Sequence, residues 1–386
     1  MRFGIDATGW NNLRGFGRFT RNVVARLVEI DLDADYVLLV DRVTARETLP
    51  GRAEIRVLHT RMPPREAARA GSNRGIAELI GAARTTRRDQ LDAFLFPSLH
   101  TWFPFPGAPA VVGVHDTISE DLPELAFPRR RDRVLWRLKQ RLALRSARRV
   151  FTVSEAARAA VCGHLGLPSE AVSVVPEAPD PVFAPRTPEE IAVAREEIGA
   201  PSGYVLYAGG ISPHKNVTGL VDAYAAVLQR MPDAPSLVLV GALEGEMFAS
   251  SAAEVRQKIT RQGLDGHVLL PGFVPDETLA RLYAGATVVV NPSLGEGFGL
   301  PAVEAAACGA PLVLSDLPAH RESLGDAAVY VRAGDTSALA STLERVLRDH
   351  ELRRALGLQA TAAVAGMTWD AAADAIAGLL REAAQR

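Results

Sequence analysis

In the stretch VNPSLGEGFGLPAVEAAACGAP, residues 290–311, a buried strand, a glycine-rich turn and a helix follow one another directly. The apolar run ATVVV (286–290) predicts the strand, Pro301 suits the first turn of a helix, and Gly309 suits its end. The turn aims the first N–H groups of the helix at one point, and such a helix start attracts a phosphate or a sugar hydroxyl. The stretch therefore predicts an α/β fold with a polar-ligand site at the end of a strand.

Similar apolar runs recur along the chain in two series, with helix-like stretches between them. The runs are continuous rather than alternating, as expected for parallel strands buried on both faces. Alternating strands and helices favour two doubly wound, Rossmann-like domains. The predicted strands are 2–6, 36–40, 93–96, 110–114 and 149–153 in the first series, and 204–208, 236–240, 267–270, 286–290 and 311–314 in the second.

A proline-rich segment separates the two series. Residues 176–188 (PEAPDPVFAPRTP) contain five prolines, which favour a linker over a helix or a central strand. A length of 386 residues also suggests two domains. We expect two facing α/β domains, with boundaries at 1–180 and 181–365, and a ligand in the cleft between them at the carboxyl ends of the strands.

Composition excludes several classes of protein. The chain is 48% hydrophobic and 23% charged, and its two cysteines provide no disulfide framework, so that a reducing, cytoplasmic setting is favoured. No apolar run reaches about 18 residues, and the segment MRFGIDATGW lacks the apolar core of a secretory signal. The net charge of −2 conceals an excess of six basic residues in 1–185 and of eight acidic residues in 186–386, which is too even for a nucleic-acid-binding domain.

The segment EGFGLPAVE, residues 296–304, resembles the Glu-x7-Glu signature of retaining GT-B glycosyltransferases of family 4. The resemblance implies that Glu296 lies by the donor sugar near its anomeric carbon, and that Glu304 accepts hydrogen bonds from the ribose of the nucleotide. The amides of Gly297, Phe298, Gly299 and Leu300 would hold sugar hydroxyls and phosphate. The resemblance covers nearly the whole chain and is weakest over 42–92.

A second match, AGGISPHKNV at 208–217, is similar to the family's phosphate loop, G-R-x-x-x-x-K-N. It implies that Lys215, one of only three lysines in the chain, neutralises the diphosphate leaving group. Ser212 and Asn216 are assigned to the donor site in the same way, as is Val274 in the matching stretch 270–286. Gly210 replaces the family's usual arginine, so a second guanidinium is either missing or supplied by another residue, for which Arg18 and Arg321 are the candidates.

The N-terminal half contributes two further matches. RGFGRFTRNV (14–23) resembles the family's glycine loop, in which Gly15, Gly17 and Arg18 would close over the diphosphate. His115 follows the predicted strand 110–114, where the family carries a histidine whose backbone or ring contacts the donor sugar; a purely structural histidine is the alternative. The expected catalytic residues are therefore His115, Lys215 and Glu296.

Two segments bear on organisation and partners. Residues 366–386 resemble the family's C-terminal helix, which crosses back to the first domain. In VVPEAPDPVF the usual Asn-Gly is replaced by Glu177-Ala178, with no chemical consequence expected. Residues 128–149 contain ten basic residues and one acid among apolar residues. This composition is typical either of a helix that packs on the sheet with its arginines in solvent, or of a helix that lies on an anionic membrane surface.

The resemblance implies a retaining hexosyltransferase that moves mannose or glucose from a nucleotide diphosphate sugar to the hydroxyl of a glycan or lipid-linked acceptor. The N-terminal domain would serve the acceptor and the C-terminal domain would bind GDP-mannose or a UDP-sugar, with no metal because an Asp-x-Asp motif is missing between the domains. A front-face displacement is implied, with a double displacement through Glu296 as the alternative. The competing functions are a GT-B sugar-nucleotide epimerase, a non-catalytic sugar-binding subunit and a Rossmann dehydrogenase; GFGRFT lacks the third glycine that a dehydrogenase needs.

Overall fold

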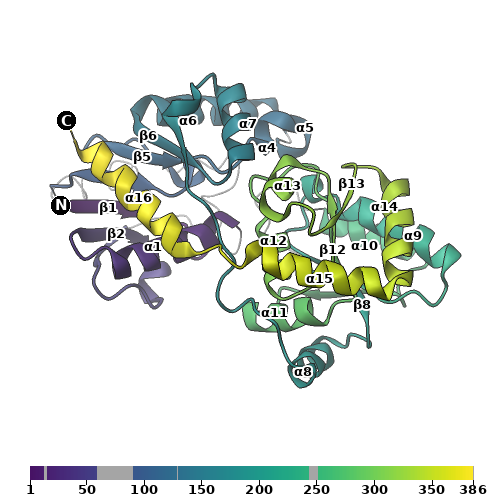
Figure 1. Cartoon of the computed structure of the whole chain (residues 1–386). Helices are drawn as coiled ribbons and strands as arrows, with labels where there is room; N and C mark the ends of the chain where they lie inside the picture. Colours follow the sequence, from purple (N-terminus) through teal and green to yellow (C-terminus); the bar gives the residue numbers. More distant parts are fainter. Residues whose placement is uncertain (13–14, 59–89, 128, 243–250, 386) are drawn as a thin grey trace. The chain divides into compact units, whose positions relative to one another are not determined.

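The computed structural model describes residues 1–385 except 13–14, 59–89, 128 and 243–250 (Figure 1). The chain divides into two compact units, residues 1–177 with 368–386, and residues 178–367. The boundaries expected from the sequence, at 180 and 365, lie within three residues of this division. The residues 175–187 between the last strand of the first unit and the first helix of the second contain no helix or strand, as their prolines predict.

The first unit contains a parallel sheet of seven described strands in the order β3-β2-β1-β4-β5-β6-β7. The order reverses direction between β1 and β4, as in doubly wound folds. Its strands are β1 (Arg2–Asp6), β2 (Asp35–Asp41), β3 (Glu54–Leu58), β4 (Ala93–Phe96), β5 (Ala110–Gly113), β6 (Ala147–Thr152) and β7 (Val172–Val174). Its described helices are α1 (Gly15–Ile30), α4 (Ile118–Asp121), α5 (Pro123–Ala126), α6 (Arg130–Ser146), α7 (Glu155–Leu165) and α16 (Trp369–Ala384).

The C-terminal helix α16 belongs to this first unit and lies along α1 (Figure 1). Its apolar face buries Trp369, Ile376 and Leu380. The Arg381 guanidinium lies 2.7 Å from the carboxylate of Asp31, at the end of α1. The helix therefore completes the hydrophobic core of the unit that begins the chain.

The second unit contains six described strands, all parallel, in the order β10-β9-β8-β11-β12-β13. Here the order reverses between β8 and β11, which are hydrogen-bonded neighbours. The strands are β8 (Tyr204–Ala208), β9 (Ser236–Val240), β10 (Val268–Gly272), β11 (Val288–Asn291), β12 (Leu312–Ser315) and β13 (Val329–Val331). The helices are α8 (Pro188–Ile198), α9 (Val217–Arg230), α10 (Ala252–Arg261), α11 (Asp276–Gly285), α12 (Leu300–Ala307), α13 (Pro318–Leu324), α14 (Thr336–Arg348) and α15 (His350–Val364).

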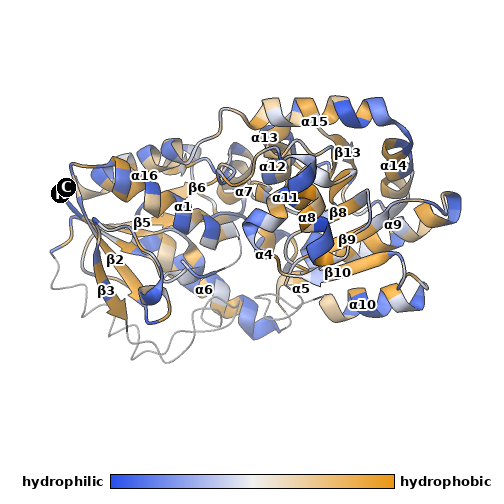
Figure 2. Cartoon of the chain, turned by 90° about the horizontal axis from the view of Figure 1, so that it is seen from below, coloured by the Kyte–Doolittle hydropathy of each residue, from blue (hydrophilic) through white to orange (hydrophobic). Residues whose placement is uncertain are grey.

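Helices cover both faces of this second sheet, which explains why its strands are apolar throughout. Every residue of β8, β11 and β12 is buried. Helix α9 packs against α10 and α14, whereas α12 packs against α11 and α15. Figure 2 shows the strands β8 and β9 mainly in the hydrophobic colour, while the helices around them carry both colours. Successive strand residues thus enter two hydrophobic layers.

Three strands that the sequence does not predict, β3, β7 and β13, lie at sheet edges. β3 includes the charged residues Glu54 and Arg56, and β7 and β13 have three residues each. Edge strands are short and tolerate charge, because only one side of the strand is hydrogen-bonded. All ten predicted strands, nine central ones and the edge strand β10, are confirmed within two residues at each end.

Candidate active site

Two loops of the second unit meet where its strand order reverses. The loop after β8 carries Ser212, Lys215 and Asn216, and the turn after β11 carries residues 292–299. Because β8 and β11 are parallel neighbours, their carboxyl ends open at the same edge of the sheet. This edge is the ligand-binding position of doubly wound sheets.

Lys215 and Glu296, 81 residues apart in sequence, form a direct ion pair at this edge. The Lys215 Nζ donates to Oε1 of Glu296 over 2.6 Å, and the side chains are 17% and 7% exposed. The hydroxyl of Ser293 also lies 2.7 Å from the same oxygen and 2.6 Å from Oδ1 of Asn291, the last residue of β11. Both hydrogen bonds thus go to one oxygen of the Glu296 carboxylate, Oε1. The ammonium of Lys215 has two N–H donors besides the one directed to Glu296.

The environment keeps Glu296 ionised. Burial by itself would raise the pKa of its carboxyl group, but the charge of Lys215, the nearby His320 and hydrogen bonds from Lys215 and Ser293 outweigh burial. Together they lower the pKa to about 2. A carboxylate at this edge therefore persists well below neutral pH.

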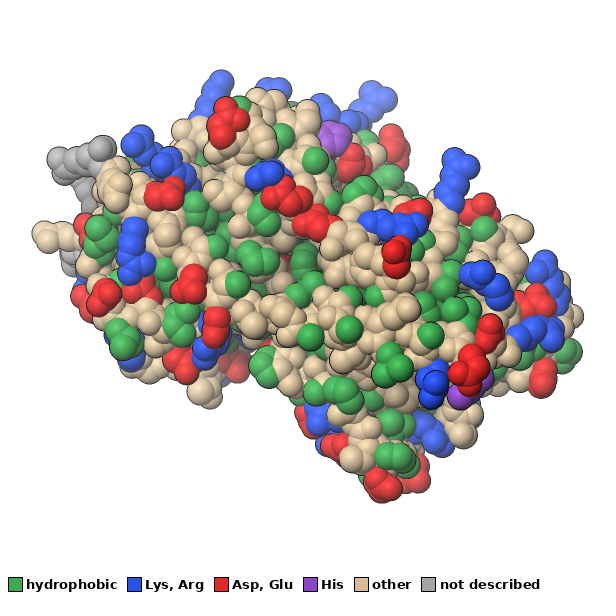
Figure 3. All heavy atoms as spheres, in the orientation of Figure 1, with side chains coloured by type: hydrophobic (Ala, Val, Ile, Leu, Met, Phe, Trp, Pro, Cys, Tyr) green, Lys and Arg blue, Asp and Glu red, His purple; other side chains and the backbone are tan. Residues whose placement is uncertain are grey.

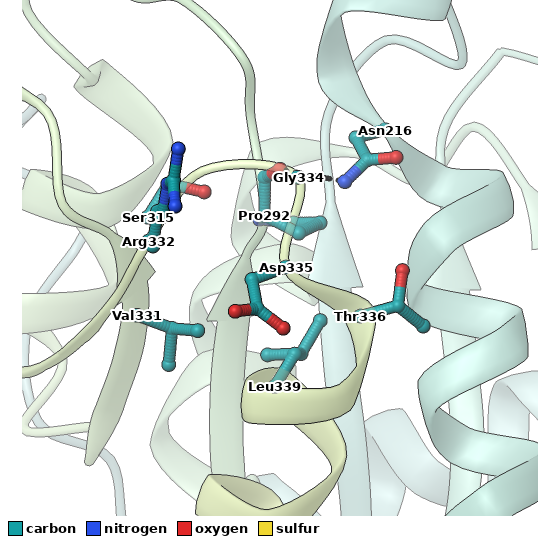
Figure 4. A pocket seen from close by; sticks show the side chains of 9 residues that line it. All are labelled: Asn216, Pro292, Ser315, Val331, Arg332, Gly334, Asp335, Thr336 and Leu339. Carbon is teal, nitrogen blue, oxygen red and sulfur yellow. Dashed lines mark hydrogen bonds between the residues drawn. The ribbon is translucent and has the colours of Figure 1, made fainter.

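Asn216 links the two loops. Its backbone has a positive φ of 53°, a conformation that asparagine tolerates better than most residues, and its Nδ2 donates to the carbonyl oxygen of Pro292 over 3.2 Å. The N–H of Leu294 donates to the carbonyl of His214 over 2.7 Å. Figure 4 shows the Asn216–Pro292 bond at one wall of a small pocket, whose other lining residues are Ser315, Val331, Arg332, Gly334, Asp335, Thr336 and Leu339. These two hydrogen bonds connect the loop after β8 to the turn after β11.

The predicted helix start is present as the N-terminus of α12. Gly299 is its N-cap with a φ of +90°, Pro301 lies in its first turn, and Gly309, just after the helix, has a φ of +80°. A Cβ on Gly299 would lie 2.7 Å from the ring of His320, so the turn has no room for a side chain there. The absence of a side chain at Gly299 leaves the backbone N–H groups at the start of α12 open to a close approach, and their binding role stays a prediction.

His320 supports this turn from α13. The ring is fully buried, its Nδ1 donates to the carbonyl of Ser315 over 2.9 Å, and burial lowers its pKa. Its Nε2 is buried without a hydrogen-bond partner. The hydroxyl of Ser323 reaches the carbonyl of Phe298 over 3.3 Å. Two polar residues of α13 thus pack against the glycine-rich turn.

The remaining predicted residues of this unit take distinct positions. Ser212 is buried, with its hydroxyl 3.3 Å from Nδ1 of His214. Glu304 is 3% exposed within α12, and Val274, 7% exposed, lies between β10 and α11. Phe298, in the turn before α12, is buried. Leu300, the first residue of α12, is buried as well.

In the first unit, His115 follows β5 as predicted. Its Nε2 donates to the carbonyl of Pro97 over 2.7 Å, and its ring makes a T-shaped contact with the ring of Phe19 in α1. Burial lowers the pKa of His115 to about 4, against the raising effect of the Pro97 hydrogen bond, so the ring is neutral at neutral pH. The Nδ1 lies 3.8 Å from Oε1 of Glu177, which is itself only 5% exposed.

The predicted glycine loop at Gly15, Gly17 and Arg18 is helical instead, because α1 begins at Gly15. A Cβ on Gly17 would lie 2.0 Å from the carbonyl oxygen of Asn12, so a close backbone contact accounts for this glycine. At Gly15 a Cβ would meet nothing within 4 Å, which leaves space next to the helix start. The pattern Gly-x-Gly favours a loop by sequence alone, whereas here it forms the first turn of a helix.

The two candidates for a second guanidinium differ in their surroundings. Arg321 makes a bidentate pair with Asp316, at 2.7 and 3.1 Å, and lies over the ring of Tyr330. Arg18 lies in the first turn of α1 in the other unit. The carbonyl of Gly210, where the family's arginine is replaced, accepts a hydrogen bond of 2.6 Å from the hydroxyl of Tyr207.

Ser293, His320 and Glu177 belong to these sites but were not among the predicted site residues. Ser293 was within reach of sequence reasoning, because it lies in the same turn as Glu296. The substitution Glu177-Ala178 was noticed, but its burial beside His115 depends on how residues 175–187 run. Nothing in the segment around His320 indicates its place under Gly299. Among the described residues, no three His, Cys, Asp or Glu side chains gather as they would to hold a metal ion.

Comparison with known proteins identifies the family of the chain. A model of glycosyltransferase family 4 matches residues 13–182, and one of group 1 glycosyl transferases matches residues 202–349. The chain is also 31% identical over 264 residues to the O-antigen chain mannosyltransferase B of Escherichia coli, covering 68% of this chain and 67% of that one. The chain belongs to glycosyltransferase family 4. It is therefore a glycosyltransferase.

Another relative of this family 4 glycosyltransferase is the D-inositol 3-phosphate glycosyltransferase of Nocardia farcinica, 32% identical over 209 residues, or 53% of this chain and 46% of that one. The alignments thus span about two thirds of the first relative and less than half of the second.

Solved structures identify the fold as GT-B. A sucrose-phosphate synthase from Thermosynechococcus elongatus matches with a TM-score of 0.78 at 20% identity, covering 99% of this chain and 98% of that one. Anabaena HepE in complex with UDP-glucose matches with a TM-score of 0.76 at 20% identity, covering 98% and 99%. In the described residues, no helix combines the length and apolar character needed to cross a membrane.

Proposed function

We propose that this glycosyltransferase moves a hexose from a nucleotide diphosphate sugar to an acceptor hydroxyl with retention at the anomeric carbon. The observation that carries the proposal is the ion pair of Lys215 and Glu296 beside the α12 helix start. A cation and a row of backbone N–H groups suit a diphosphate. A carboxylate beside them suits the hydroxyls, or the developing positive charge, of a sugar.

In the proposed reaction the bond between the anomeric carbon and the diphosphate oxygen breaks while a bond to the acceptor oxygen forms on the same face. The acceptor proton passes to an oxygen of the departing phosphate. Lys215 offers two N–H donors beyond the one directed to Glu296, so it can neutralise the charge that grows on the leaving group. The N–H groups of residues 297–300 stabilise the same charge, and no metal takes part in this scheme.

Before the donor binds, Glu296 is ionised at neutral pH because its pKa is about 2. We propose that its free oxygen faces the donor sugar near the anomeric carbon. Glu304 would accept the ribose hydroxyls, and Val274 would lie by the base. His115, neutral at neutral pH, would contact the sugar through its backbone or its ring.

We propose GDP-mannose as the donor, because the relative in Escherichia coli is a mannosyltransferase. A UDP-sugar is the second candidate, because Anabaena HepE is solved with UDP-glucose. The acceptor would be a glycan or a lipid-linked saccharide of the cell surface, as the O-antigen chain relative suggests.

A thermal-shift panel of nucleotide sugars tests the donor, because a ligand that binds only the folded state raises Tm. GDP-mannose should raise Tm more than mannose or GDP-glucose. A UDP-sugar that raises Tm while GDP-mannose does not would overturn the choice of donor. Incubation with donor alone should leave the sugar's configuration unchanged by NMR, whereas an epimerised donor would overturn the transferase proposal.

A further inference from the structure

Glu177 is a buried acid to which the proposed reaction assigns no part. It follows β7 at the end of residues 1–177, and its side chain is only 5% exposed. On the face drawn in Figure 3, acidic side chains lie at the surface, several of them next to basic ones. Glu382 of α16 is such an acid, since it is exposed and pairs with Arg149. A buried carboxyl group needs hydrogen-bond donors, so the groups around Glu177 indicate what it does.

One of these groups is the ring of His115, whose second nitrogen has a lone pair. The Nε2 of His115 carries a proton, because it donates to the carbonyl of Pro97 over 2.7 Å. Burial lowers the pKa of His115 to about 4, so the ring holds no second proton at neutral pH. Its Nδ1 is therefore an acceptor, and among the described residues none donates a hydrogen bond to it.

The Nδ1 of His115 lies 3.8 Å from Oε1 of Glu177. This distance is too long for a hydrogen bond, whichever of the two groups carries a proton. The exposed pair of His164 and Asp121 in the same unit gives the contrast, because its nitrogen and oxygen are only 2.6 Å apart. His115 and Glu177 thus place two acceptors beside each other with no proton shared between them.

A ligand that donates two hydrogen bonds from neighbouring atoms satisfies both acceptors. Two hydroxyls on adjacent carbons of a hexose do so, because each O–H can donate to one acceptor. An ionised phosphate offers only acceptor oxygens and does not fit. The His115 side chain is 12% exposed and follows β5, at the edge of the parallel sheet where ligands bind in doubly wound folds. A small polar group can therefore reach the pair.

We propose that Glu177 is a specificity-determining residue: its Oε1 and the Nδ1 of His115 accept hydrogen bonds from two adjacent hydroxyls of the donor hexose. This inference rests on the proposed function and deepens it, because it names the residue that selects the sugar. A sugar without an O–H at one of these two carbons leaves a largely buried acceptor unpaired. The replacement of the family's usual Asn-Gly by Glu177-Ala178 then has a chemical consequence, which the sequence alone did not lead us to expect.

Calorimetric titration of the full chain with GDP and with GDP-mannose tests the proposal, because GDP has the nucleotide but no sugar. Glu177→Leu should bind GDP-mannose at least about tenfold more weakly than the wild type does, and should bind GDP equally well. Glu177→Gln keeps an acceptor oxygen and should recover most of the affinity. The matched control Glu382→Gln should bind both ligands like the wild type. If a UDP-sugar is the nucleotide sugar that raises Tm, that sugar and UDP take the place of this pair of ligands.

Analogues of the donor that each lack one sugar hydroxyl identify the groups that Glu177 and His115 recognise. At least one analogue should bind the wild type about tenfold more weakly than the donor does. In Glu177→Leu the same analogue should bind as well as the donor, because the partner of the missing hydroxyl is already absent. In NMR spectra of the wild type with ¹⁵N-labelled histidine, the donor should move the Nδ1 resonance of His115, whereas the nucleotide alone should not.

Equal affinity of the wild type and Glu177→Leu for the donor would overturn the proposal, as would an equal weakening of GDP and GDP-mannose. A Nδ1 resonance of His115 that the donor leaves unmoved would overturn it as well, and this measurement requires no variant to fold. The proposed function fails differently: in that case no nucleotide sugar raises the Tm of the wild type, and the inference falls with it.

Discussion

The ammonium of Lys215 and the carboxylate of Glu296 are 2.6 Å apart and largely buried, so each charge depends on the other. Removal of one partner leaves an uncompensated charge at the sheet edge, which costs more than the pair contributes. A comparable pair, Lys258 and Asp222, has the same 2.6 Å distance, but its side chains are 27% and 35% exposed. The pair of Lys258 and Asp222 has the same distance but is less buried and lies elsewhere in the unit. It therefore serves as a control for the pair of Lys215 and Glu296.

The low pKa of Glu296 predicts a pH dependence of stability. The pKa falls from 4.5 to about 2 on folding, so the unfolded chain binds more protons between these values. The contribution of Glu296 to the free energy of unfolding is complete above about pH 4.5 and is lost as the pH falls toward 2. In Glu296→Gln this contribution is absent, so the difference from the wild type should shrink as the pH falls. Urea unfolding at several pH values measures it.

Asp222→Asn is the control for this measurement, because it removes a carboxylate of an ion pair that is less buried than Glu296. Its difference from the wild type should be small at every pH, as for most surface pairs. A difference for Glu296→Gln that stays constant from neutral to about pH 3 would show that the folded-state pKa of Glu296 is not lowered.

Gly299→Ala should destabilise the second unit by about 1–3 kcal/mol, because a side chain at a φ of +90° is strained. Its Cβ would also lie 2.7 Å from the ring of His320. The expected second effect is a loss of the donor-induced rise in Tm. Gly266→Ala is the control, since nothing lies within 4 Å of its Cβ position, and it should change stability by less than about 0.5 kcal/mol. Equal effects of the two changes would contradict the described turn.

Site residues can be predicted from the sequence where they belong to a recognisable local pattern. Glu296, Lys215, Asn216 and His115 each follow a strand at its carboxyl end, and a strand end can be located from the apolar run before it. His320 and Glu177 acquire their neighbours only when α13 and the segment after β7 pack. No local spacing carries that information.

Among the elements, the loop after β8 depends on Asn216 for its connection to the turn after β11. Asn216→Gly keeps the positive φ but removes the hydrogen bond to Pro292, which should cost about 1 kcal/mol. Asn216→Ala removes the bond and also strains the backbone, which should cost about 1–2 kcal/mol more. Chemical unfolding measures both. Equal stability of the two variants would contradict the left-handed conformation at this position.

Strands can be predicted from the sequence where both faces of the sheet are buried, because the strand is then a continuous apolar run. The central strands β8, β11 and β12 are wholly buried, so their residues are continuously apolar. The edge strand β3 contains Glu54 and Arg56 and gives no such run. The first turn of α1 was misinterpreted because Gly15 and Gly17 favour loops, whereas the close contact of Gly17 with Asn12 requires glycine within a helix.

For the whole molecule, the placement of α16 predicts that the end of the chain stabilises its beginning. A chain that ends at Met367 lacks the apolar face of α16, including Trp369, Ile376 and Leu380, and exposes the surface of α1 that it covers. Calorimetry should then show that the first unit unfolds at a lower temperature or loses its cooperative transition. The second unit, residues 178–367, should keep its own transition.

A chain that ends at Ala384 is the control, because it keeps the whole of α16. It should unfold like the full chain. If the chain that ends at Met367 also unfolds like the full chain, α16 contributes nothing to the first unit, and the division of the chain into these two units would be wrong.

The rate of sugar transfer by Lys215→Ala is the most direct test of the central claim, which is that the edge formed by β8 and β11 performs the chemistry. With GDP-mannose or whichever donor raises Tm, kcat should fall by more than about tenfold, since the cation that stabilises the leaving diphosphate is removed. Lys258→Ala, which breaks the other 2.6 Å lysine pair of the same unit, should retain the kcat of the wild type. An unchanged kcat in a folded Lys215→Ala protein would contradict the account.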